Sequence, residues 1–66
     1  MKIHEFINNI PDFSSPITIT VFEDNQEITV SEGLSRKMLL TLFGEHNIFS
    51  IGATQGGFIK INLGSL

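Results

Sequence analysis

The chain has 66 residues, no cysteine, and seven acidic against four basic residues, which gives a net charge of −3 at pH 7. The absence of cysteine excludes a disulfide framework and a thiolate metal site. Nucleic-acid binding is disfavoured, because no stripe of basic side chains is present to neutralise phosphates. The length predicts one small domain, residues 1–66, with a modest core.

Hydrophobic residues make up 41% of the chain, so a domain of this size is expected to leave some of them exposed. That favours a homodimer or a partner-binding surface over a self-sufficient monomer. No apolar run is long enough to span a membrane. The opening MKIHEF places a glutamate where a secretory signal would continue apolar. We therefore expect a cytoplasmic protein.

Residues 2–10 predict a short helix, because apolar residues recur there at helical spacing. Pro11 ends it, since the residue before a proline avoids the helical region. In the loop that follows, we expect Phe13 to fill part of the core. The predicted buried face of the helix consists of Ile3, Phe6, Ile7 and Ile10.

Residues 17–30, ITITVFEDNQEITV, alternate apolar and polar side chains around Asp24-Asn25, which predicts a β-hairpin with an acidic tip. Aspartate and asparagine tolerate the positive φ that a two-residue hairpin turn requires. The register is well specified, because a one-residue slip would mix the two faces. The predicted pairs are Val21–Ile28 and Ile19–Val30 on an aliphatic face, and Thr20–Thr29 and Phe22–Glu27 on a mixed polar face.

Residues 31–43, SEGLSRKMLLTLF, predict the main helix, with an apolar stripe of leucine, methionine and phenylalanine. Either Ser31 or Ser35 is expected to be its N-cap. Gly44 follows directly and is typical of a left-handed C-terminal stop.

Residues 48–63 predict a second hairpin, with a three-residue turn at Thr54-Gln55-Gly56 whose glycine is left-handed. Residues 63–66 are expected to form a frayed tail. The predicted inner-face pairs are Phe49–Ile61 and Ile51–Ile59.

Together these elements predict an α+β fold in the order helix, hairpin, helix, hairpin (αββαββ). The expected architecture is a four-stranded antiparallel sheet with both helices packed on its aliphatic face.

The hairpin tip is the best candidate site, because acidic residues gather there beside an aromatic residue. A solvated turn is the plainer interpretation, since acidic residues and asparagine are good turn formers. As a site, the surface would bind a protein through an aromatic anchor with a charged rim. The candidate protein-binding residues are Thr20, Phe22, Glu23, Asp24, Glu27 and Thr29.

The sequence contains no clear phosphate-binding, metal-binding or catalytic motif. The turn GATQGG lacks the lysine and the following helix of a phosphate-binding loop. His4 and His46 have no metal-ligand spacing, and no serine lies in a nucleophile elbow. We therefore expect a protein that is not an enzyme and that has no metal and no cofactor.

The opening MKIHEFINNIP, followed by a Thr/Ile strand and an acidic turn, resembles small orphan proteins of phages and mobile elements in Gram-positive bacteria. Several proteins of that kind are anti-CRISPR inhibitors. The resemblance implies a bacterial host cell and an inhibitory role. The net charge of −3 is smaller than that of strongly acidic DNA mimics, which favours an interface of apolar anchors together with acidic groups.

The expected function is therefore inhibition or modulation of a larger, basic, nucleic-acid-handling host protein, such as a CRISPR effector nuclease, without direct contact with nucleic acid. The alternative is a structural or self-assembling homo-oligomeric module without inhibitory activity. A homodimer is compatible with the first function as well.

Overall fold

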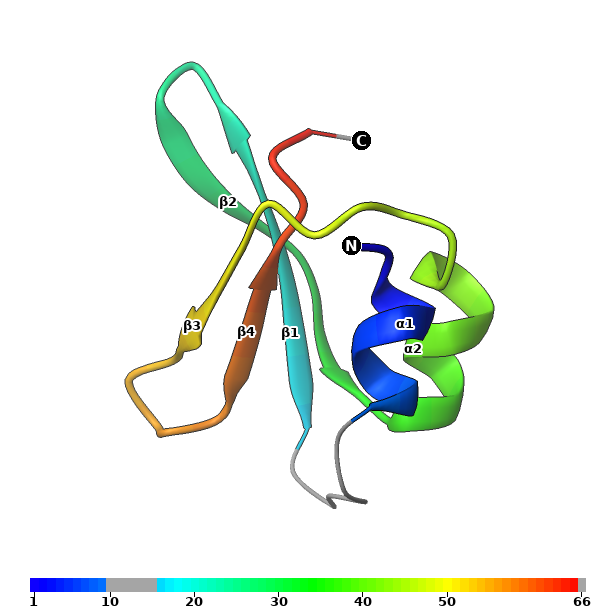
Figure 1. The fold of residues 1–66 in the computed structure, drawn as a ribbon. Helices are drawn as coiled ribbons and strands as arrows, with labels where there is room; N and C mark the ends of the chain where they lie inside the picture. Colours follow the sequence, from blue (N-terminus) through cyan, green and yellow to red (C-terminus); the bar gives the residue numbers. More distant parts are fainter. Residues whose placement is uncertain (10–15, 66) are drawn as a thin grey trace.

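The computed structural model describes residues 1–9 and 16–65. The two helices lie to one side of a four-stranded sheet, with the strands in the spatial order β2-β1-β4-β3 (Figure 1). The predicted α+β class is confirmed, whereas Ile10 and Phe13 lie outside the described residues. The elements are α1 (Ile3–Asn8), β1 (Ile17–Glu23), β2 (Gln26–Leu34), α2 (Arg36–Phe43), β3 (Ser50–Ala53) and β4 (Ile59–Asn62).

The sheet is mixed, so the prediction of a purely antiparallel sheet is wrong. Strand β1 pairs with β2 in antiparallel orientation and with β4 in parallel orientation. The parallel pairing sets Ile17 beside Ile59 and Ile19 beside Ile61, which aligns aliphatic side chains across the centre of the sheet. Each hairpin forms from residues that are close in the chain. The two hairpins join through the burial of aliphatic side chains that are distant in the chain.

The first hairpin forms largely as predicted. Asp24 and Asn25 both have positive φ, at 53° and 64°, as a two-residue hairpin turn requires. The pairs Val21–Ile28, Thr20–Thr29 and Phe22–Glu27 are confirmed.

The predicted pairing of Ile19 with Val30 is wrong, because Ile19 lies opposite Ser31. Val30 is therefore an extra residue in β2. An extra residue of this kind forms a β-bulge, which bends the strand and strengthens its twist. A second irregularity follows before Ile17 pairs with Leu34.

The main helix begins at Arg36 rather than at residue 31, because β2 continues to Leu34. Gly33 has φ of +70°, which a right-handed helix does not accept. Ser35 is the N-cap, and its hydroxyl accepts a hydrogen bond from the Met38 N–H at 3.2 Å. The predicted left-handed stop at Gly44 is wrong, since its φ is −55°. Its carbonyl accepts a hydrogen bond from the His4 N–H at 3.0 Å.

The second hairpin turns one residue later than predicted. The Thr54 N–H donates to the Phe58 carbonyl at 2.8 Å, and Gly57 takes the left-handed position with φ of +83°. The Thr54 hydroxyl holds this turn in place by accepting a hydrogen bond from the Phe58 N–H at 3.2 Å. Moving the turn by one residue shifts the pairing by two.

The predicted pairs of this hairpin, Phe49–Ile61 and Ile51–Ile59, are therefore wrong. Ile61 lies opposite Ile51, and Ile59 lies opposite Ala53. Phe49 is left outside the inner face that was predicted for it.

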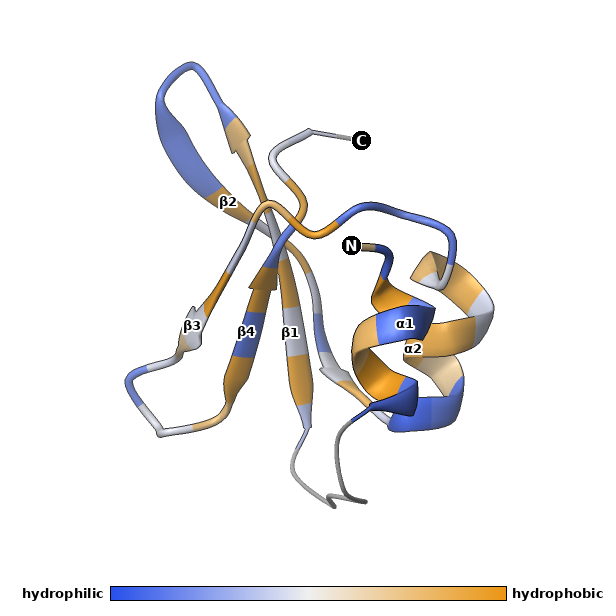
Figure 2. Ribbon diagram, viewed as in Figure 1, coloured by the Kyte–Doolittle hydropathy of each residue, from blue (hydrophilic) through white to orange (hydrophobic). Residues whose placement is uncertain are grey.

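The core lies between the helices and the sheet, and both layers contain hydrophobic residues along their ribbons (Figure 2). Within the described residues, no helix is long and apolar enough to cross a membrane. Buried residues of this core include Ile3 and Ile7 of α1, Leu39 of α2, and Ile17, Ile19 and Ile61 of the sheet.

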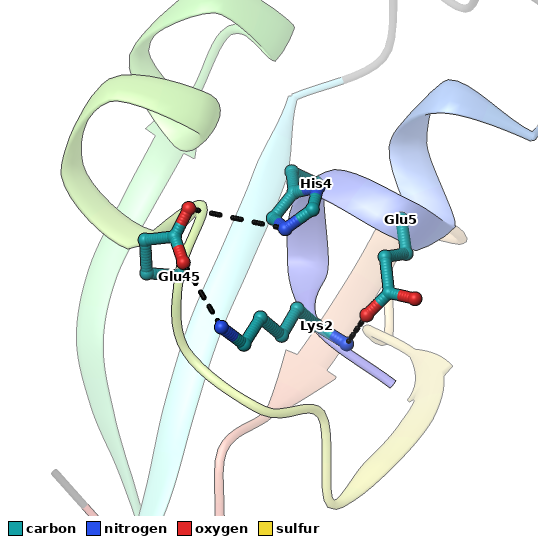
Figure 3. Close-up of polar contacts among 4 residues, drawn as sticks. All are labelled: Lys2, His4, Glu5 and Glu45. Atoms are coloured by element: carbon teal, nitrogen blue, oxygen red, sulfur yellow. Dashed lines mark hydrogen bonds and ion pairs between the residues drawn. The ribbon is translucent and has the colours of Figure 1, made fainter.

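Polar contacts hold α1 against the end of α2 (Figure 3). Glu45 accepts from Lys2 Nζ at 3.0 Å and lies 3.8 Å from His4 Nε2. The hydrogen bond and the charge of Lys2, followed by the charge of His4, lower the pKa of Glu45 below its ordinary value of 4.5. The backbone N–H of Lys2 donates to Glu5 Oε1 at 3.0 Å, which satisfies an N-terminal donor of the helix.

The segment after β4, expected to belong to a frayed tail over residues 63–66, stays against β1. Leu63 is buried, and its N–H donates to the Thr20 carbonyl at 2.9 Å. The Gly64 carbonyl accepts from the Phe22 N–H at 2.8 Å. Residues 63 and 64 therefore continue alongside the hairpin, and they help to position Phe22.

Candidate functional site

The tip of the β1–β2 hairpin extends beyond the helices (Figure 1) and is hydrophilic (Figure 2). Glu23 and Asp24 are exposed there. Within the part of the chain that the structure describes, neither carboxylate has an ion pair or a side-chain hydrogen bond. The two charges therefore face solvent without a cation to neutralise them, and they attract cations on an approaching surface.

An aromatic pair lies next to this tip, on the face of the sheet opposite the helices. The rings of Phe22 and Phe49 meet edge to face, with centroids 5.8 Å apart and an interplanar angle of 86°. The two residues remain 42% and 67% exposed, respectively. Exposed aromatic rings beside charges are typical of the anchors of protein interfaces.

Phe49 reaches this position because it precedes the regular part of β3. Its N–H donates to the Asn62 carbonyl at 2.7 Å, although Asn62 is the register partner of Ser50. Phe49 thus has no strand partner of its own, and its side chain turns to the open face. A Cβ built on Gly64 would lie 3.4 Å from Phe49, so the chain after β4 also supports the ring.

Glu27, the third acidic residue of the predicted tip, is engaged within the chain. Its Oε1 accepts from Lys60 Nζ at 2.7 Å, an ion pair that joins β2 to β4 across β1. A partner that uses Glu27 must compete with Lys60. The net negative charge of the tip therefore comes from Glu23 and Asp24.

The two predicted threonines differ in accessibility. Thr29 is exposed, whereas Thr20 is buried and its hydroxyl accepts from the Asn62 side-chain amide at 3.0 Å. Thr20 is therefore not available to a partner, and it contributes to the fold through its contact with Asn62. Of the predicted set, the structure thus brings Phe22, Glu23, Asp24 and Thr29 to the surface around the hairpin.

Sequence reasoning missed Phe49 as a member of this surface and Lys60 as the partner of Glu27. Regular alternation places Phe49 on the inner face with Ile51, but Phe49 and Ser50 both lie opposite Asn62, and this irregularity turns the Phe49 side chain to the other face. The contact of Lys60 with Glu27 depends on the pairing of β4 with β1, which no local pattern indicates. We call the exposed set formed by Phe22, Glu23, Asp24, Thr29 and Phe49 the hairpin surface.

The remaining candidates stay dispersed. Among residues 1–9 and 16–65, no three metal-ligating side chains gather at one place, and no pocket is present. His4 contacts Glu45 near α1, while the His46 ring lies 5.7 Å from that of Phe43. Comparison of the chain with protein-family models, with curated proteins and with solved structures finds no match in any of the three.

Proposed function

We propose that this protein binds a basic surface of a larger, nucleic-acid-handling protein of a bacterial host cell and thereby inhibits or modulates it. The observation that carries the proposal is the pairing of two unneutralised carboxylates, Glu23 and Asp24, with an exposed Phe22–Phe49 pair at the projecting end of the fold.

The carboxylates and the aromatic side chains of the hairpin surface would contribute to binding in different ways. Unpaired carboxylates attract a basic partner and speed its association. Aromatic side chains supply affinity when a partner covers them, because they bury large apolar areas with little loss of conformational entropy. A surface with both features fits a protein groove that is basic at its rim and apolar at its centre.

Nucleic-acid-handling proteins carry such basic grooves, because they must neutralise phosphates. The resemblance of the opening residues to proteins of phages and mobile elements narrows the proposed partner to a CRISPR effector nuclease. Occupation of its nucleic-acid channel by the hairpin surface would exclude the substrate.

The test is cleavage of target DNA by purified CRISPR effector nucleases in the presence of increasing amounts of the protein. We expect one of them to be inhibited, and the double substitution Glu23→Gln/Asp24→Asn to weaken that inhibition by about tenfold. The matched control is Glu32→Lys, which changes the net charge by the same two units but lies near the other end of β2. Full cleavage at every concentration of the unsubstituted protein would refute the proposed partner.

A further inference from the structure

Strand β3 forms one edge of the sheet, and no strand lies on its outer side in the described part of the chain. All four of its residues are exposed. Folded proteins usually block such edges with charges, prolines or bulges, because the unpaired backbone groups invite another strand. Residues 47–59 contain no charged residue and no proline, and the pairing from Ser50 to Ala53 is regular.

The opposite edge is protected by contrast. Strand β2 carries Glu27 and Glu32 and has two register irregularities. Charges and bulges at an edge disfavour the addition of a further strand. The edge that is open to pairing is therefore β3, which lies away from the helices (Figure 1).

The backbone groups that face outward from β3 belong to Ile51 and Ala53. Hydrogen-bonded and non-hydrogen-bonded pairs alternate along an antiparallel ladder. Thr54 donates to the Phe58 carbonyl, so Gly52, two residues earlier, also turns its groups toward β4. Ile51 and Ala53 turn theirs to the open side.

This edge is complementary to itself. If two copies meet in antiparallel orientation, Ile51 of each copy lies opposite Ala53 of the other, and Gly52 lies opposite Gly52 on a two-fold axis. Each outward N–H and C=O then meets an acceptor or donor of the second copy. Such an interface uses the same residues on both sides, as a two-fold dimer requires.

Gly52 supports close approach at that axis. Within a single copy of the chain, nothing requires a glycine at position 52. The φ of Gly52 is not positive, and an added Cβ would contact only Lys60 Cε, at an ordinary distance of 3.7 Å. A glycine inside a strand weakens it and often marks a place where another backbone approaches.

Side chains and charge favour a second copy as the occupant. Ile51 is 48% exposed although it belongs to the aliphatic face, and pairing would cover it with Ala53 of the other copy. Each molecule carries a net charge of −3, but the edge itself is uncharged. Two copies can therefore pair through it without placing like charges opposite each other.

We propose that two copies of this chain pair through the outer edges of their β3 strands, antiparallel and with Gly52 on the two-fold axis, so that their sheets become continuous. The hairpin tip and β2 lie toward the other edge. Of the hairpin surface, only Phe49 lies next to β3, which begins at Ser50. The two proposals are tested with different residues, so either can fail without the other.

A symmetry-specific crosslink tests this arrangement, since the chain contains no cysteine. Opposed residues in a non-hydrogen-bonded pair have Cα atoms about 4.5 Å apart, within the range for a disulfide. We expect Gly52→Cys to form a covalent dimer on mild oxidation at least tenfold faster than Ser50→Cys. In the proposed pairing, Ser50 of one copy is displaced by four residues, or about 13 Å along the strand, from Ser50 of the other. Equal rates for the two variants would overturn the proposed axis.

The second test needs no crosslink. Sedimentation equilibrium measures the average mass in solution. At protein concentrations of about 1 mM, the average mass of the unsubstituted protein should approach twice the chain mass of 7.3 kDa. Ile51→Lys should remain monomeric, because the pairing would bring two lysine charges close to the axis. The matched control Ile28→Lys makes the same substitution at a strand isoleucine that is 40% exposed, and it should dimerise. A monomeric unsubstituted protein, or a dimeric Ile51→Lys variant, would contradict the proposal.

Discussion

The side-chain amide of Asn62 donates to the hydroxyl of Thr20 at 3.0 Å, and both residues are buried where β1 and β4 pair in parallel. The other end of the same amide, Oδ1, accepts from the Gly64 N–H at 2.7 Å. Asn62 therefore links the central strand to the segment that follows β4. This buried polar contact joins the two hairpins.

Replacement of Thr20 by valine should destabilise the fold although the two side chains have nearly the same shape. It removes the acceptor and leaves the buried Asn62 amide unsatisfied, which costs about 1–3 kcal/mol in the free energy of unfolding. The melting temperature should fall by about 4–8 °C per kcal/mol. Thr20→Ser keeps the oxygen and is the control. Equal melting temperatures of the valine variant and the unsubstituted protein would show that the contact contributes nothing.

Phe22 and Phe49 should be coupled in stability. A double-mutant cycle with Phe22→Leu and Phe49→Leu is expected to give a coupling free energy of about 0.5–1.5 kcal/mol, because edge-to-face rings attract beyond their buried area. Urea unfolding of the four proteins measures it. Phe58 is also exposed and makes no ring contact with Phe22 within the described residues. A cycle of Phe22 with Phe58→Leu should therefore be additive, and equal coupling in both cycles would argue against a specific ring pair.

The start of α2 can be located by removing its cap. Ser35→Ala should cost about 1 kcal/mol, since the Met38 N–H loses its acceptor. Ser31→Ala should change little, because Ser31 lies in β2. Thermal unfolding followed by circular dichroism compares the two. A larger effect at Ser31 would place the helix start where the sequence pattern alone predicts it.

Glu45 should contribute a pH-dependent part of the stability. Contact with Lys2 lowers its pKa in the folded protein below the ordinary value of 4.5, so the charged form is favoured by folding. The contribution is then present above about pH 4.5 and is lost as the pH falls through the lower, folded-state pKa. Glu45→Gln should remove this dependence. Melting temperatures measured between pH 7 and pH 3 test it, and parallel curves for the two proteins would contradict the assignment.

The parts of the fold that the sequence predicts well are those that depend on neighbours in the chain. In the first hairpin, Asp24 and Asn25 supply the turn, and the alternation on both sides sets the pairs. The main helix ends at Phe43 as its apolar stripe predicts. Its start was misplaced because Ser31 and Ser35 are both good caps, and the choice depends on how far β2 extends.

The parts that escaped prediction depend on contacts between distant residues or on a choice between equivalent neighbours. Thr20 and Asn62 are 42 residues apart, and no local pattern indicates that their strands run parallel. Gly56 and Gly57 both accept the left-handed position of the second turn, and the sequence does not rank them. The candidate site was therefore predicted at its charged tip. Its second aromatic residue, Phe49, was missed because Phe49 and Ser50 both lie opposite Asn62, and the alternation of side chains does not indicate that irregularity.

The central claim is that the hairpin surface binds a basic partner, and its most direct test is the association rate with a purified CRISPR effector nuclease as a function of salt. For the unsubstituted protein and for Glu32→Lys, the rate should fall by about tenfold between low and high salt, because unpaired carboxylates steer the encounter. For Glu23→Gln/Asp24→Asn, the rate should be low at the outset and nearly independent of salt. Association of this variant at the unsubstituted rate in low salt would contradict the account.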